Sequence, residues 1–254
     1  MKHAKLSISF LFIFCLVSSA YGEVSYTPAV KSVKNRTVSK IKIYGQIKTE
    51  DIQQFHLLKE AAKISATSIG LKSLDRYPLL IELDSLGGSV SAAIAIGKEI
   101  REANPLVVKV SESAYCVSAC VLILAGAVTR HVKGLVGIHR PYLDDDKAYT
   151  VSMQKQSYSE MEKSIKDYLS SVNVPTSLYD AMFRIPPEKV RYLTVTELQE
   201  YNLNEDDPYY KEAKDAKNAK ELGLSKSEFQ GLNSICENSQ SFEEANNCFS
   251  RLFR

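Results

Sequence analysis

The sequence carries almost no net charge, and this excludes one class of partner. The formal net charge is +2, and residues 1–22 hold Lys2 and Lys5 without an acidic residue, so the remainder of the chain has a net charge of 2 − 2 = 0. A neutral chain offers no global basic field to nucleic acid. A phosphate-binding loop of the Walker type, internal repeats and low-complexity tracts are also missing. We therefore expect no nucleic-acid partner.

The sequence also lacks an apolar run long enough to cross a membrane. Residues 6–17 are apolar, follow Lys2 and Lys5, and precede the small residues Ser18, Ser19 and Ala20. This run falls short of the ~20 residues that a membrane span requires. The arrangement is typical of a secretory signal peptide, with a transmembrane anchor as the alternative. We expect residues 1–22 to be removed, the mature chain to have no membrane span, and the protein to be exported from the cytoplasm.

Cysteine is scarce, and its spacing matches no standard zinc site, so we expect no metal. Of five cysteines, Cys15 lies in the expected signal peptide, which leaves an even set for an oxidising compartment. Cys236 and Cys248 lie where two Ser-x-x-Glu capping boxes predict short helices, and a bridge between them would staple a helical hairpin. Cys116 and Cys120 then pair by default, with a redox-active pair as the alternative. We expect mild reduction of this bridge to lower activity.

Strand-like and helix-like patterns alternate from Ile41 to Arg140, which predicts an α/β domain with mostly parallel strands. Later in the chain, apolar residues at helical spacing predict a helix over Ser157 to Ser171. Glu205 to Glu221 is rich in charge and indicates an exposed helix or linker. The expected organisation is a signal peptide (1–22), an arm or edge strand (23–39), a catalytic domain (40–204), and a charged linker with a disulfide-stapled helical hairpin (205–254).

Two turns within the domain carry residue types that suit catalysis. An apolar strand from Leu79 to Asp84 leads into Gly87 and Gly88, and an amphipathic helix follows. Glycines allow the backbone to approach a bound carbonyl, and the start of a helix leaves N–H groups free to meet negative charge. We expect Gly87 to lie in a substrate-binding loop.

The second turn contains Ser118, in a segment that we expect to come directly after the strand-like run Leu106 to Val110 and directly before an apolar segment. At a sharp bend between strand and helix, its hydroxyl would lie close to free backbone N–H groups, which supplies a nucleophile and an oxyanion donor together. A further strand-like run, Leu135 to Ile138, ends at His139 and is stopped by Pro141. An imidazole at that place is a candidate base, although a serine before a helix is usually only a cap and a lone histidine is usually structural.

Taken in order, these motifs resemble the proteolytic subunit of the Clp protease, within the ClpP/crotonase superfamily. They are Leu83-Asp-Ser-Leu-Gly-Gly-Ser-Val90, Cys116-Val-Ser-Ala-Cys120 and Gly137-Ile-His-Arg-Pro141. More narrowly, the chain is similar to secreted bacterial ClpP-like proteins over residues 40–203. The resemblance implies a superhelical ββα spiral, here with a small helical C-terminal extension.

The resemblance implies a serine peptidase that needs no cofactor. Ser118 would be the nucleophile, His139 the general base, and the N–H groups of Gly88 and Ala119 the oxyanion hole. Peptides or unfolded proteins would be the substrates, and the protein would form a homo-oligomer. One position departs from the family, because Val190 stands where the family has its acidic third member. Loss of that carboxylate usually costs orders of magnitude in rate.

No other acidic residue fits the family pattern. Glu188 is near in sequence, and Asp144 to Asp146 follow the histidine, but these aspartates are more typical of a solvated surface loop. Two alternatives to a peptidase therefore stay open. One is a catalytically silent binding or assembly module with a ClpP-like fold. The other is an acyl-CoA enzyme of the crotonase type. This second alternative is the weaker one, because a serine turn paired with Ile-His-x-Pro is the pattern of the peptidases.

Overall fold

The computed structural model describes residues 23–28, 39–68, 79–103, 106–143, 150–237 and 247–248. The expected signal peptide, Asp144 to Asp146 and the second C-terminal capping box lie outside these residues. The strands are β1 (Glu23–Thr27), β2 (Lys40–Ile47), β3 (Leu79–Gly88), β4 (Leu106–Val110), β5 (Tyr115–Val117), β6 (Thr129–Val132), β7 (Leu135–Ile138), β8 (Arg191–Tyr192) and β9 (Glu205–Asp206). The helices are α1 (Glu50–Ser68), α2 (Val90–Glu102), α3 (Cys120–Gly126), α4 (Val151–Ser171), α5 (Ser177–Phe183), α6 (Val195–Glu200), α7 (Pro208–Glu221) and α8 (Lys226–Glu237).

The sheet is built from parallel strands with antiparallel additions at its edges. β3 is its centre: it pairs with β2 from Leu80 to Gly88, with β4 over its first half, and with β5 through Ser85 and Cys116. β6 extends the sheet from β4, and β7 extends it from β5, both in parallel. β1, β8 and β9 close the edges in antiparallel pairing. The expected arm is therefore an edge strand at Glu23–Thr27, and the prediction of mostly parallel strands is confirmed.

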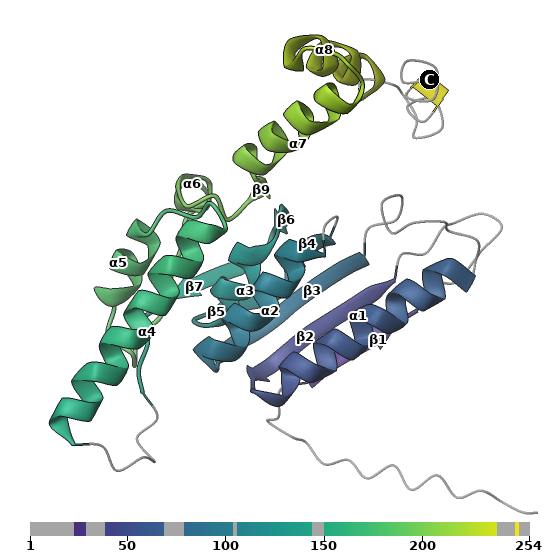
Figure 1. The fold of residues 1–254 in the computed structure, drawn as a ribbon. Helices are drawn as coiled ribbons and strands as arrows, with labels where there is room; N and C mark the ends of the chain where they lie inside the picture. The colour runs from purple at the N-terminus through teal and green to yellow at the C-terminus, as the bar shows by residue number, and fades with distance from the viewer. Residues whose placement is uncertain are drawn as a thin grey trace, which may run out of the picture.

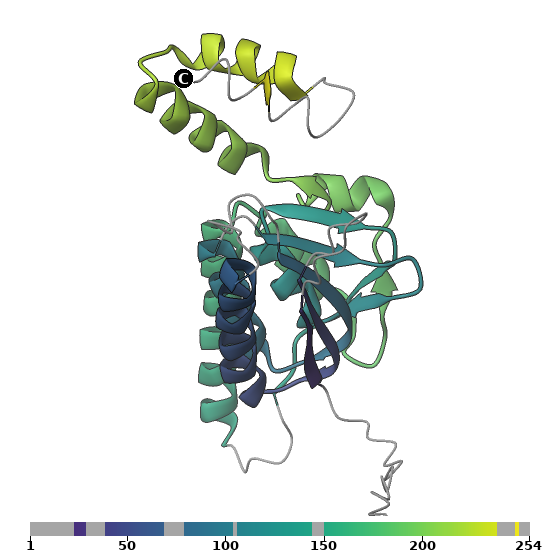
Figure 2. The ribbon, with the colours of Figure 1, turned by 90° about the vertical axis from the view of Figure 1, so that its right-hand side faces the viewer.

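The order of the elements produces a spiral of ββα units. β4, β5 and α3 form one unit, and β6, β7 and α4 form the next. The first strand of each unit, β4 or β6, lies on one side of β3 in the strand order. The second strand of each unit, β5 or β7, lies on the other side. The helices α1 to α4 lie on one side of the sheet, as the two views show (Figures 1 and 2). The α/β fold class predicted from the sequence is confirmed.

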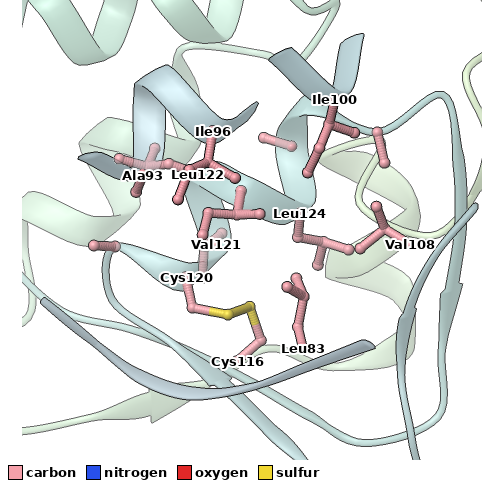
Figure 3. Packing of buried hydrophobic residues seen from close by; sticks show 14 of the residues in the cluster. Leu83, Ala93, Ile96, Ile100, Val108, Cys116, Cys120, Val121, Leu122 and Leu124 are labelled. Atoms are coloured by element: carbon pink, nitrogen blue, oxygen red, sulfur yellow. A yellow bond between two sulfur atoms is a disulfide. The ribbon is translucent and has the colours of Figure 1, made fainter. Parts of the chain in front are cut away.

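The core lies between the sheet and α2 and α3, where alternate residues of β3 and most of α3 are buried. α3 packs directly on α2 because Gly97 and Gly126 meet there: a Cβ on Gly126 would collide with the backbone of Gly97. The Tyr168 hydroxyl, from α4, donates a hydrogen bond of 2.8 Å to the Leu122 carbonyl. Figure 3 shows Cys116 and Cys120 inside this core, beside Leu83. The helix that follows Ser118 is thus held on three sides.

Three elements differ from the expectation. The strand expected to end at Asp84 continues to Gly88, so the two glycines end β3 and do not form a separate turn. The strand Leu106–Val110 does not lead directly to Ser118, because the three-residue strand β5 intervenes. The helix expected at Ser157 begins at Val151, and Thr150 caps it by accepting a hydrogen bond from the Met153 N–H. Its added turns are exposed, so they carry no apolar stripe from which periodicity could have predicted them.

The C-terminal helices α7 and α8 extend away from the sheet (Figures 1 and 2). The charged segment that contains α7 is not uniformly exposed, because Asp207 is fully buried. Its carboxylate caps α7 through the Tyr209 and Tyr210 N–H groups and pairs with Arg101, at 2.7 Å from Nη2. Burial alone would raise the pKa of Asp207, but hydrogen bonds from Arg101 and Asn173 outweigh it and lower the pKa. This buried carboxylate fixes the start of α7 to α2.

Candidate active site

Ser118 occupies a strained turn between β5 and α3. Its φ is +58°, in the left-handed region, which costs a residue other than glycine about 1–2 kcal/mol. The turn is held from both sides: the Ser118 N–H donates to the Gly137 carbonyl at 2.9 Å, and its own carbonyl accepts from the Val121 N–H at 3.0 Å. The side chain is partly exposed. A serine held in such a conformation at a strand-to-helix turn is typical of a nucleophile.

The end of β3, at Gly87, lies directly against the Ser118 turn. Gly87 has φ +106° and is buried; a Cβ there would lie 2.7 Å from Ser118 Cβ and 3.2 Å from the Ala119 nitrogen. Gly88 has φ +142° and an exposed backbone, and a Cβ there would collide with Ile47. Only glycine permits this approach, because any side chain at these positions would push the turns apart. The structure therefore brings Gly87, Ser118 and Ala119 together, while the next residue, Gly88, packs against Ile47.

Ala119 directly precedes α3, where the first N–H groups have no carbonyl partner within the helix. Its φ and ψ of −57° and −27° are already helical, so its N–H is aligned with those of the first turn. Helix N-termini stabilise negative charge through such N–H groups and the helix dipole. The Ala119 nitrogen lies beside both Gly87 and Ser118.

His139 follows β7, the parallel neighbour of β5. The register pairs Val117 with Gly137, so Ser118 and His139 come from the same ends of two adjacent strands. The imidazole is 8% exposed and lies against Tyr142, with 6.1 Å between the ring centroids. Its Nδ1 lies 2.9 Å from the Arg140 carbonyl oxygen. Among the described residues, no hydrogen bond joins Ser118 to His139; in unliganded enzymes such bonds are often long and shorten only when substrate binds.

No carboxylate orients His139 within the part of the chain that the structure describes. Val190 lies beside the histidine strand: a Cβ on Gly137 would be 2.6 Å from its Cγ1, and its side chain is 45% exposed. Glu188 is exposed and makes no hydrogen bond to His139. The departure from the family pattern at Val190 therefore has a counterpart in the structure, where an apolar side chain covers the strand before the imidazole.

Both disulfides join the cysteines that were expected to pair. Cys116 and Cys120 have 5.2 Å between their Cα atoms and enclose the Ser118 turn, while Cys236 and Cys248 connect α8 to the residues beyond it. Cys116 and Cys120 are both 0% exposed. A reductant can reach that bridge only when the turn opens. The expectation that mild reduction lowers activity is thereby changed, because mild reduction of the folded protein would leave this bridge intact.

Three hydrogen bonds near the site were not anticipated from the sequence. The Arg140 backbone N–H donates to the Ile185 carbonyl and its Nε donates to the Phe183 carbonyl, both at 2.8 Å. The Tyr158 hydroxyl donates to the Pro141 carbonyl at 2.9 Å. Burial raises the pKa of Tyr158, and a tyrosine hydroxyl is a protonated donor at neutral pH even without that shift. The only residue of this segment that the sequence analysis had used was Pro141, as the residue that stops the strand before His139.

Within the described ranges, no three His, Cys, Asp or Glu side chains are grouped in a way that would hold a metal ion. In the same ranges, no helix has the length and apolar character needed to cross a membrane.

No known family model matches the sequence, and no curated protein matches it. Among solved structures, the chain is similar to a point mutant of ClpP1 from Listeria monocytogenes, with 20% identity, a TM-score of 0.49, and coverage of 65% of this chain and 88% of that one. It is also similar to two point mutants of the 1510-N membrane-bound stomatin-specific protease, each with a TM-score of 0.46. The first of these is 19% identical, and the match covers 64% of this chain and 75% of that one. For the second, which is in complex with a substrate peptide, the identity is 20% and the coverage 64% and 71%. These are similarities of fold, at an identity too low to carry a function.

Proposed function

We propose that this protein is a serine peptidase that cleaves peptide bonds with Ser118 as nucleophile and His139 as general base. The observation that carries the proposal is the conformation of Ser118, a residue other than glycine held at φ +58° at the start of a buried helix. A residue that only capped α3 would need no such strain, and the N-cap of α3 is Ala119, with no side-chain capping hydrogen bond.

In the proposed reaction, Ser118 Oγ attacks the substrate carbonyl while its proton passes to His139 Nε2. The carbonyl oxygen becomes an oxyanion, and the N–H groups of Gly88 and Ala119 stabilise it. Removal of one such donor typically costs about 10²–10³ in rate. The intermediate then expels the amine, which takes the proton from His139 and leaves an ester on Ser118. Water, deprotonated by His139, hydrolyses the ester and restores the serine.

The test is covalent labelling with a fluorophosphonate, in which Ser118 Oγ displaces fluoride from phosphorus. The mature, oxidised protein is labelled, and mass spectrometry locates the adduct. We expect an adduct on Ser118 and none in the Ser118→Ala variant, with an unchanged circular dichroism spectrum. Ser113→Ala is the matched control, because Ser113 is an exposed serine in the turn before β5. Labelling that persists in Ser118→Ala would refute the assignment.

A second candidate function is a catalytically silent binding module, and Val190 is the observation that favours it. If no adduct forms on Ser118 while both disulfides and the fold are intact, this candidate replaces the first. A peptide and ester library that is never turned over would lead to the same conclusion.

Further parts of the proposal concern the setting of the enzyme. We place the mature chain in the periplasm or outside the cell, consistent with its two disulfides. Short peptides or unfolded proteins are the proposed substrates, with no cofactor. The exposed apolar residues Val151 and Met153 at the start of α4 support assembly into a homo-oligomer. Light scattering after gel filtration tests this, and a monomeric mass across the concentration range would contradict it.

A further inference from the structure

We propose that Arg140 is a positioning residue whose backbone carbonyl takes over from a carboxylate the task of holding the His139 tautomer. This inference rests on the proposed function, since it explains how His139 acts as a base. In a triad, the third residue accepts a hydrogen bond from Nδ1–H and so keeps Nε2 unprotonated and able to take the serine proton. Here Val190 occupies the position at which the family resemblance places that residue.

The contact at Nδ1 fixes the proton by elimination. A backbone carbonyl oxygen can only accept a hydrogen bond, so Nδ1, at 2.9 Å from the Arg140 oxygen, must be the donor. In a neutral imidazole the other nitrogen is then an acceptor, because which nitrogen carries the proton is set by the partner of the other one. His139 is therefore held with Nε2 free of a proton, which is the tautomer that a general base requires.

The direction of the Arg140 carbonyl is itself constrained by the backbone. The residue before a proline is restricted to extended conformations, so Pro141 limits the ψ angle that aims this carbonyl. The Arg140 N–H donates to the Ile185 carbonyl at 2.8 Å, which ties the same peptide segment to the chain after α5. The Tyr158 hydroxyl, from α4, holds the next carbonyl, that of Pro141, at 2.9 Å.

The side chain of Arg140 adds a further attachment. Its Nε donates to the Phe183 carbonyl at 2.8 Å, and its guanidinium lies 4.7 Å from the centre of the Phe183 ring. The Phe183 ring also meets the Tyr158 ring edge to face, with 6.4 Å between centroids. The backbone and the side chain of Arg140 are thus both fixed to the end of α5, which leaves its carbonyl no freedom to turn away from the imidazole.

The experiment reads the tautomer of His139 directly. Nitrogen NMR of protein labelled with ¹⁵N-histidine separates protonated from unprotonated ring nitrogens, and His139→Gln assigns the signals. Spectra and fluorophosphonate labelling rates are recorded for the wild type, Arg140→Ala, Arg140→Lys and Pro141→Ala. Arg184→Ala is the matched control, because it removes an exposed arginine next to Phe183. Thermal unfolding of each variant shows whether it is folded at the temperature of the measurement.

We expect the wild type to carry its proton on Nδ1. Arg140→Ala should populate the tautomer with the proton on Nε2, and its Ser118 should be labelled about 10-fold more slowly. A factor of this size corresponds to the loss of one hydrogen bond from a charged group, here from Arg140 Nε to the Phe183 carbonyl. Arg140→Lys, which keeps a donor for the Phe183 carbonyl, should restore part of the rate, and Arg184→Ala should match the wild type. Pro141→Ala should shift the tautomer in the same direction as Arg140→Ala, without removal of a charge.

The outcomes separate this inference from the proposed function. A wild-type spectrum with the proton on Nε2 overturns the positioning role, whether or not Ser118 is labelled. A wild-type proton on Nδ1 that persists in folded Arg140→Ala and Pro141→Ala also overturns it. If the tautomer responds as expected but Ser118 is never labelled, the positioning role stands and the peptidase proposal fails.

Discussion

The two disulfides allow a prediction: loss of the C-terminal bridge should reduce stability more, whereas loss of the bridge around Ser118 should reduce the reactivity of that serine more. The perturbation is a pair of double variants, Cys116→Ala with Cys120→Ala, and Cys236→Ala with Cys248→Ala. The first bridge spans a sequence separation of 4 and the second a separation of 12. In the chain-entropy treatment, these loops stabilise the folded state by about 2 and about 3 kcal/mol respectively. Loss of the C-terminal bridge should therefore reduce the free energy of unfolding more.

Reactivity should follow the reverse order, because only one bridge encloses Ser118. The φ of +58° stores about 1–2 kcal/mol of strain, which the bridge helps to hold. Without the bridge the turn relaxes, and strain of that size lowers the population of the competent conformation by about 5- to 30-fold. The labelling rate at Ser118 should fall by that factor in the Cys116/Cys120 variant and stay unchanged in the Cys236/Cys248 variant.

The assay combines urea unfolding, followed by circular dichroism, with the rate of fluorophosphonate labelling at a urea concentration where both variants are folded. Equal labelling rates in the two variants would refute the view that the bridge holds the nucleophile turn. A larger loss of labelling in the C-terminal variant would refute it as well. The wild type treated with a mild reductant provides a further comparison, and it should lose the bridge to the partly exposed Cys248 first.

Three further predictions concern single residues. Gly87→Ala should abolish labelling of Ser118, because a Cβ would lie 2.7 Å from Ser118 Cβ and 2.9 Å from the Val117 carbonyl oxygen at a φ of +106°; labelling at the wild-type rate would contradict this. Asp207→Asn keeps an N-cap for α7 but removes the charge that faces Arg101. The free energy of unfolding, measured in urea, should therefore fall by about 2 kcal/mol. An unchanged urea midpoint would count against a stabilising ion pair. The folded-state pKa of Asp207 is lowered, so its contribution is complete above the ordinary aspartate value of about 3.9 and is lost as the pH falls from there through the lower folded pKa. The difference in unfolding free energy between wild type and Asp207→Asn should therefore shrink only in that acidic range, and a difference that shrinks near neutral pH would show that another group is responsible.

The predictable part of the fold is the part in which each segment buries its own apolar residues. β3 and α2 were anticipated because alternation and helical periodicity show a buried face within each segment. β5 was missed because its three residues form a strand only through their pairing with β3 and β7. The start of α4 was missed because its first turns bury nothing.

The candidate site divides in the same way. Gly87, Ser118 and Ala119 lie next to one another, and the sequence indicated this because the residue types in these two segments constrain the backbone locally. The partner of His139 could not be anticipated, because every residue has a carbonyl and the sequence does not show which one meets a given side chain. The contacts that fix Arg140 join it to residues more than 40 positions later, a distance across which no local pattern extends.

The complete burial of Cys116 and Cys120 has a consequence for the order of events during biosynthesis. The bond has to form while the Ser118 turn is still open to an oxidant, before α3 settles on α2. A chain that folds among thiols would enclose this pair in its reduced form, where a later oxidant cannot reach the sulfur atoms. Two preparations of this protein, one folded in an oxidising compartment and one folded among thiols, would then have the same sequence and the same fold. They would differ only in whether Cys116 and Cys120 are oxidised or reduced.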